Sequence, residues 1–155
     1  MNLFEQQKPL FAISSCLLGN RVRYDGKDQA LGDILVSLKA KYRLLPLCPE
    51  MAIGLGVPRP PIHLRKSSEG YRAVLIDQPE TDYTQALCDY AASVLQQHPE
   101  LKGIILKQKS PSCGTGKTKL FDEKGTFMSA DGWGVFATEI QKLQPSLILI
   151  GDDAL

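Results

Sequence analysis

The stretch Phe11-Ala12-Ile13-Ser14-Ser15-Cys16 begins with apolar residues and ends in small polar residues and a cysteine. A short apolar run with polar residues at its end is typical of a buried strand, so the first strand is predicted to end near Cys16. Two similar apolar runs occur later in the chain, at 44–47 and 103–106, ahead of Cys48 and Cys113 respectively. Each of these three predicted strands is therefore followed by a cysteine.

Amphipathic stretches separate the predicted strands. Apolar residues three and four positions apart predict helices over 31–42, about 81–97 and about 133–140, the last beginning at Trp133. Turn residues predict hairpins across Ser68-Glu69-Gly70 and near Gly125, and a last strand is predicted at 147–150. Strands that alternate with helices favour a single α/β domain over 1–155, with a three-layer Rossmann-like fold and a mainly parallel sheet.

The composition of the 155-residue chain is that of a folded protein. Hydrophobic residues make up 43%, which is enough for a core and excludes a disordered chain. Lys and Arg number 18 against 17 Asp and Glu, and this balance argues against a nucleic-acid partner. No apolar run is long enough to span a membrane, and Glu5, Gln6 and Gln7 interrupt the region where a signal peptide is apolar. We therefore expect a cytoplasmic protein without a membrane partner.

The four cysteines form no Cys-x-x-Cys pair, which excludes a zinc ribbon or a ferredoxin-type run. In a reducing compartment such cysteines are metal ligands, nucleophiles or core residues more often than disulfides. Ligands of open α/β sheets bind beyond the carboxyl ends of the strands. We therefore expect Cys16, Cys48 and Cys113 at one edge of the sheet, with Cys113 in an exposed loop over 107–116. Cys88 lies within a predicted helix and is expected in the core.

Two other kinds of functional site are excluded by the spacing of their motif residues. The segment Gly114-Thr115-Gly116-Lys117-Thr118 looks like the end of a phosphate-binding P-loop, but the first glycine of that motif would stand at position 111, which is Pro. A small tyrosine phosphatase would need five residues between Cys16 and its Arg, which places that Arg at position 22, where this chain has Val. Neither a nucleotide triphosphatase nor a phosphatase is therefore predicted.

Three motifs occur together in this chain. The first is Ile13-Ser14-Ser15-Cys16-Leu17-Leu18-Gly19, followed by Val22-Arg23-Tyr24-Asp25-Gly26; the second is Cys48-Pro49-Glu50 with Pro58-Arg59-Pro60-Pro61; the third is Lys109-Ser110-Pro111-Ser112-Cys113-Gly114. In this order, over nearly the whole chain, they resemble the thiouracil desulfidase family, formerly a domain of unknown function. Many members of that family have an acidic residue where this chain has His63, and an additional cysteine where it has Val22.

The resemblance implies a [4Fe-4S] cluster bound by Cys16, Cys48 and Cys113, with one iron lacking a protein ligand. Thiolates are the soft ligands that iron–sulfur clusters require, and an open metal position can accept a substrate atom. The implied reaction removes sulfur from a thiolated nucleobase such as 2-thiouracil and yields uracil and sulfide, with the open iron as the sulfur acceptor.

The same motifs supply the other candidate site residues. Glu50 lies two residues beyond Cys48 and is the candidate acid–base residue, with capping of a following turn as the structural alternative. Ser110 and Ser112 flank Pro111, and their hydroxyls are candidates for hydrogen bonds to the substrate ring or the cluster; Ser110 is assigned to catalysis and Ser112 to substrate binding. The remaining substrate-binding candidates are Ser14, Arg59 and Asp25, although Arg59 could instead form an ion pair and Asp25 a turn.

A second functional class remains open from the sequence alone. The cysteines could belong to a non-catalytic metal, iron–sulfur or redox protein with no organic substrate. Glu50 and the serines beside the cysteines favour an enzyme, because a closed metal site does not need them. The sequence leaves open the oligomeric state and whether the natural substrate is a base, a nucleoside or a nucleotide.

Overall fold

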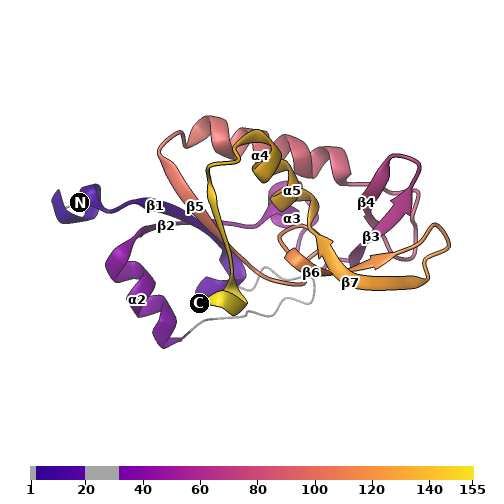
Figure 1. The fold of residues 1–155 in the computed structure, drawn as a ribbon, viewed down its shortest axis with the longest axis horizontal. Helices are drawn as coiled ribbons and strands as arrows, with labels where there is room; N and C mark the ends of the chain where they lie inside the picture. Colours follow the sequence, from indigo (N-terminus) through magenta and orange to yellow (C-terminus); the bar gives the residue numbers. More distant parts are fainter. Residues whose placement is uncertain (1–2, 20–31) are drawn as a thin grey trace.

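The first of two sheets is entirely parallel. The computed structural model describes residues 3–19 and 32–155. Its first sheet contains β1 (Leu10–Ser14), β2 (Arg43–Leu47), β5 (Leu101–Leu106) and β8 (Ile148–Gly151), in the order β2-β1-β5-β8. Every neighbouring pair runs parallel (Figure 1). The carboxyl ends of β1, β2 and β5 therefore meet at one edge.

Side chains of β1 alternate between the two faces of this sheet. Leu10 and Ala12 pack with residues of α4 (Thr84–Gln97) and α5 (Val135–Leu143). Phe11 and Ile13 pack on the opposite face with Leu38 of α2 (Asp33–Lys41). Because helices cover both faces, the strand is fully buried, as its continuous apolar sequence requires. The predicted three-layer α/β arrangement and its parallel sheet are confirmed.

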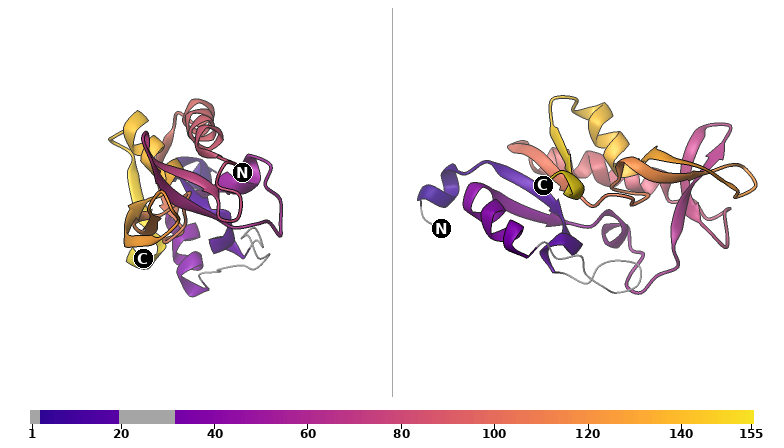
Figure 2. Two further views of the ribbon diagram at one scale, coloured as in Figure 1. Left: turned by 90° about the vertical axis from the view of Figure 1, so that its right-hand side faces the viewer. Right: turned by 60° about the horizontal axis from the view of Figure 1, so that its bottom comes forward.

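A second sheet extends the molecule at the end opposite the N-terminus (Figure 2). It contains β3 (Ile62–Ser67), β4 (Gly70–Leu75), β6 (Thr115–Phe121) and β7 (Phe127–Trp133), in the order β4-β3-β6-β7. The pairs β3–β4 and β6–β7 are antiparallel hairpins, and β3 and β6 join them in parallel. Both hairpins lie where the turn residues predicted them. Their union into a separate sheet was not predicted, because the sequence does not indicate which strands pair.

Helix α4 connects the two sheets. Its residues Ala91 and Val94 pack on the first sheet, whereas Leu87 packs against Ile62 and Leu64 of the second. The remaining elements are short: α1 (Leu3–Gln7), η1 (Ser15–Leu18), α3 (Pro49–Ala52) and η2 (Asp152–Ala154). None of the helices among the described residues has the length and apolar character needed to cross a membrane.

Two local predictions are wrong. Trp133 is the last residue of β7 rather than the first of a helix, because Gly134 intervenes and α5 begins at Val135. The segment 107–116 is not an exposed loop. Gln108, Ser112 and Cys113 are buried within it, since their polar atoms find partners inside the protein.

The central position of β5 gives a test of the fold. Ile104 is completely buried between β1 and β8, so Ile104→Ala is expected to lower the free energy of unfolding by about 2–5 kcal/mol. Val36, which is 70% exposed on α2, is the control, and Val36→Ala should change it by no more than about 0.5 kcal/mol. Urea denaturation of both variants measures the difference. Equal effects would contradict the assignment of β5 to the core.

Candidate active site

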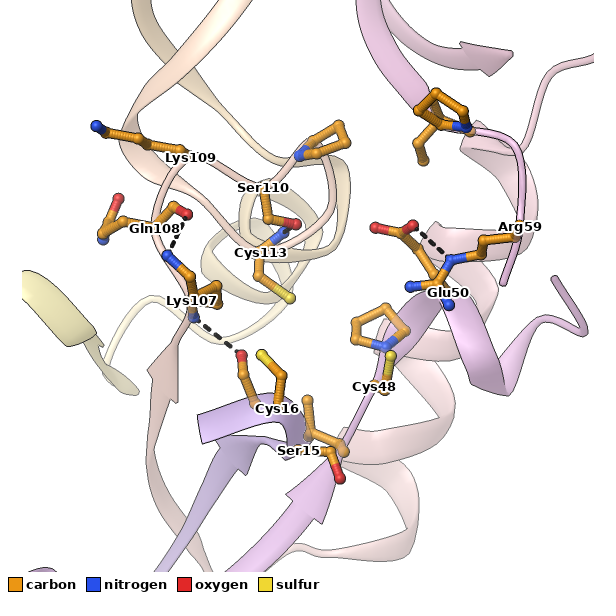
Figure 3. A pocket seen from close by; sticks show the side chains of 16 residues that line it. Ser15, Cys16, Cys48, Glu50, Arg59, Lys107, Gln108, Lys109, Ser110 and Cys113 are labelled. Atoms are coloured by element: carbon orange, nitrogen blue, oxygen red, sulfur yellow. Dashed lines mark hydrogen bonds and ion pairs between the residues drawn. The ribbon is translucent and has the colours of Figure 1, made fainter. Parts of the chain in front are cut away.

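A cavity of about 390 Å³ lies at the carboxyl ends of the parallel strands. Cys16, Cys48 and Cys113 all line it, and Figure 3 shows their sulfur atoms directed toward the same space. The three residues come from parts of the chain that are far apart in sequence. The order of the strands therefore assembles the three thiols at one site.

Each cysteine has a fixed backbone environment. Cys16 lies in η1, directly after β1, and its carbonyl accepts a hydrogen bond from the amide of Gly19, whose φ of 90° a glycine adopts readily. Cys48 precedes α3, and its carbonyl accepts from the Ala52 amide at 2.9 Å. The Cys113 amide donates to Ser110 Oγ at 3.0 Å.

Helix α5 also supports the Cys113 segment. The Val135 amide donates to the Pro111 carbonyl at 2.9 Å, and the Ala137 amide donates to the Ser112 carbonyl at 3.1 Å. These amides belong to the first turn of the helix, where backbone donors lack partners within the helix. The helix end therefore satisfies loop carbonyls and holds the backbone beside Cys113.

Burial controls the protonation of the thiols. It raises the pKa of Cys113, and the nearby Cys48, Glu50 and Cys16 raise it further, against a hydrogen bond with Ser14 that lowers it. Burial also raises the pKa of Cys48, although backbone hydrogen bonds and Arg59 oppose this effect. The influence of Cys48 and Cys16 on Cys113 is a second sign that the three thiols are close.

The donor set fits a cluster better than a single ion. No group of three or more His, Cys, Asp and Glu side chains within 3–19 and 32–155 is arranged to hold one metal ion. Thiolates around a single zinc must all lie about 2.3 Å from it, whereas an iron–sulfur cluster takes its thiolates on different irons and so spaces them more widely. Three soft sulfur donors around one cavity meet the chemical requirement of such a cluster.

Glu50 is held by two side chains at the wall of this cavity. Its Oε1 accepts a hydrogen bond from Arg59 Nε at 3.0 Å, and its Oε2 accepts one from Ser112 Oγ at 3.0 Å. Arg59 also donates to the Gly56 carbonyl at 2.7 Å. The Arg59 side chain is 3% exposed and that of Glu50 is 14% exposed, so little solvent weakens the ion pair. The carboxylate is therefore fixed in one orientation.

The serines have different environments. Ser110 Oγ accepts hydrogen bonds from the amides of Ser112 and Cys113, and no residue in the described part of the chain accepts its hydroxyl proton. Ser112 is 1% exposed and is hydrogen-bonded to Glu50. Ser14 Oγ accepts from the Lys107 amide at 2.9 Å and lies beside Cys113. Of the three, Ser14 and Ser110 line the cavity.

Of the remaining candidates from the sequence, only some are found at the cavity in the described part of the chain. Arg59 lines the cavity as the ion-pair partner of Glu50. Asp25 lies outside the described residues. Cys88 lies on α4 away from this cavity, half-buried, and burial together with a hydrogen bond to Glu139 raises its pKa to about 11. Gln108 is a buried polar residue that also lines the cavity, but nothing in its local sequence distinguishes it from a loop residue.

Comparison with known proteins agrees with this arrangement. A solved structure of a [4Fe-4S]-dependent thiouracil desulfidase, TudS, is similar to the chain with a TM-score of 0.74 and 30% sequence identity, over 96% of this chain and 93% of that one. The uncharacterized protein YbbK of Bacillus subtilis (strain 168) is 30% identical over 124 residues, which cover 76% of this chain and 79% of that protein. The model of the 2-thiouracil desulfurase family matches residues 11–152. From this match, which includes the three cysteines and the Glu50 cavity, we conclude that the chain belongs to the 2-thiouracil desulfurase family.

Proposed function

We propose that the protein is a desulfidase that removes sulfur from a thiolated pyrimidine such as 2-thiouracil, with a [4Fe-4S] cluster bound by Cys16, Cys48 and Cys113. The observation that carries this proposal is the meeting of three thiols and a clamped carboxylate at one cavity. The similarity to a [4Fe-4S]-dependent thiouracil desulfidase supports it. With three protein thiolates, the bound cluster would supply one soft, Lewis-acidic iron with a free position for the substrate sulfur.

The proposed overall reaction is a hydrolysis. Water adds its oxygen to the carbon of the C=S group, and the carbon–sulfur bond breaks, so that the products are the pyrimidine carbonyl and hydrogen sulfide. No oxidation state changes in this reaction, so no external oxidant or reductant is consumed. The protein must then move two protons from the water to the departing sulfur.

Glu50 is the residue we propose for this proton transfer. Its carboxylate faces the cavity, while Arg59 and Ser112 hold its two oxygens. A carboxylate in a fixed position can accept a proton from the attacking water and return it to the leaving sulfur. Arg59 and Ser112 act in this scheme as positioning residues, because their polar contacts are with Glu50.

Ser110 is the residue we propose for binding the substrate ring. Its oxygen is used by two backbone amides, which leaves the hydroxyl proton to be donated to an acceptor in the cavity. A thiopyrimidine such as 2-thiouracil presents such an acceptor in its carbonyl oxygen. Ser14 lies beside Cys113, so its hydroxyl would lie close to a bound cluster. We also propose that the protein acts in a reducing compartment such as the cytoplasm, where cysteines are kept reduced and can serve as metal ligands.

The first test is cofactor loading. Anaerobic reconstitution should give about four iron atoms per chain and a broad visible absorption band. Replacing Cys16, Cys48 or Cys113 with Ser should abolish the band, because a hydroxyl is a poor ligand for the cluster. Iron analysis and the absorption spectrum of each variant measure the result.

The matched control for loading is Cys88→Ser. Cys88 is the fourth cysteine and lines a different cavity, so this variant should retain iron and colour. Loss of the cluster in the Cys88 variant alone would overturn the proposed ligands. A cluster that loads fully but supports no turnover of 2-thiouracil would instead indicate a non-catalytic iron–sulfur protein.

The role of Glu50 is tested by Glu50→Gln. Gln keeps the size of the side chain and can still bind Arg59 through its carbonyl, but it cannot take a proton. Turnover of 2-thiouracil is therefore expected to fall by about 10²-fold or more, with the iron content unchanged. Uracil release by the loaded enzyme measures the effect. Unchanged turnover would leave Glu50 with a structural role only.

Substrate selectivity tests the sulfur-binding role of the site. Addition of 2-thiouracil should change the visible spectrum of the loaded protein, because a thiocarbonyl sulfur is a soft ligand. Uracil has a hard carbonyl oxygen in its place and should barely alter the spectrum at the same concentration. Equal spectral changes with the two compounds would exclude direct binding of the sulfur.

A further inference from the structure

The segment that carries Cys113 is closed by one side chain. Gln108 is 6% exposed, and its amide reaches across the segment to Thr115. Its Oε1 accepts a hydrogen bond from the Thr115 amide at 3.1 Å, and its Nε2 donates to Thr115 Oγ1. Residues 108 and 115 lie on either side of Cys113 in the chain. The paired hydrogen bonds therefore join the two ends of the cysteine loop, defined here as residues 108–115.

The cysteine loop is also tied to the end of β8. Asp152 Oδ1 accepts a hydrogen bond from the backbone amide of Gln108 at 2.7 Å. The other carboxylate oxygen, Oδ2, lies 3.8 Å from Lys107 Nζ. The chain approaches closely here, because a Cβ atom at Gly151 would overlap the Gln108 side-chain amide. Asp152, which directly follows β8, therefore holds the start of the cysteine loop, although its own segment contributes no thiol.

The backbone of the loop needs such restraint. Lys109 has a φ of 65°, in the left-handed region that residues with a Cβ disfavour. Such a conformation persists when surrounding contacts determine it. Lys109 itself is exposed, and its neighbour Gln108 makes the buried hydrogen bonds. The contacts of Gln108 and Asp152 therefore compensate an unfavourable backbone conformation four residues before Cys113.

We propose that Gln108 and Asp152 are positioning residues that keep the cysteine loop closed around Cys113 before any cofactor binds. The proposal rests on the proposed function, in which Cys113 is a cluster ligand. A closed loop presents the third thiol beside Cys16 and Cys48, so that cluster binding need not order the loop. An open loop would bind the same cluster more weakly and release it faster.

The first experiment uses the full chain without metal. Alkylation of Cys113 by iodoacetamide is followed by mass spectrometry, with Cys88 of the same molecule as the internal reference. Gln108→Met keeps the length of the side chain and removes its two hydrogen bonds to Thr115. Asp152→Ala removes the acceptor for the backbone amide of Gln108. Each should raise the rate at Cys113 by roughly tenfold, because the net effect of one or two hydrogen bonds on local opening is about that factor. The rate at Cys88 should stay constant.

Two further variants distinguish loss of the hydrogen bond between Gln108 and Asp152 from destabilisation of the whole fold. Asp152→Asn keeps an oxygen that can accept from the Gln108 amide, so it should restore slow alkylation. Lys117→Ala breaks the exposed ion pair with Asp153, which also connects β6 to η2, and it should leave the rate at Cys113 unchanged. Wild-type rates in both Gln108→Met and Asp152→Ala would overturn the proposal. A parallel rise at Cys88 would also overturn it, since the whole fold would then have loosened.

The second experiment uses the reconstituted protein. In the presence of an iron chelator, the visible band of Gln108→Met and Asp152→Ala should decay several-fold faster than in the wild type, and that of Asp152→Asn and Lys117→Ala should not. Equal decay rates would contradict a role of the loop in cluster retention. If the wild-type protein binds no cluster, the proposed function fails, while the alkylation result still decides whether these residues close the loop.

Discussion

The parallel pairing of β1 with both β2 and β5 is the constraint on which the site depends. It brings three carboxyl ends to one edge, and each strand is followed there by a different segment. After β1 the chain forms η1, which contains Cys16. After β2 it passes Cys48 and enters α3, and after β5 it forms the cysteine loop. The burial of β1 from both sides maintains this pairing, because a shift of one residue would exchange the side chains of its two faces.

The second sheet completes the cavity from the other side. Pro61 and Ile62, at the start of β3, line it together with Arg59, and β6 begins where the cysteine loop ends. Helix α4 packs on both sheets and so sets the distance between them. Arg59 thus reaches Glu50 from a segment outside the parallel sheet. The thiols depend mainly on the first sheet, whereas the orientation of the carboxylate depends both on Arg59, ahead of β3, and on Ser112 of the cysteine loop.

The sequence predicted the strands, the hairpins and the edge with the cysteines, because apolar runs and turn residues carry that information locally. It left the role of Arg59 open between substrate binding and an ion pair, since that choice depends on a contact with Glu50 across a turn. Gln108 could not be recognised, because its partners Thr115 and Asp152 come from β6 and from beyond β8. Trp133 was assigned to a helix because its spacing from Phe136 and Ile140 matches a helical face. The turn near Gly125 predicts the hairpin of β6 and β7, but it does not indicate that β7 extends as far as Trp133.

Thiols whose pKa values are raised by burial are neutral at physiological pH, so no charge repulsion between Cys48 and Cys113 opposes folding of the chain. A cluster bound as proposed would favour the thiolates through its positive charge. Under the proposed function, folding of the chain and binding of the cluster would be separate steps, and the thiol protons would be released in the second.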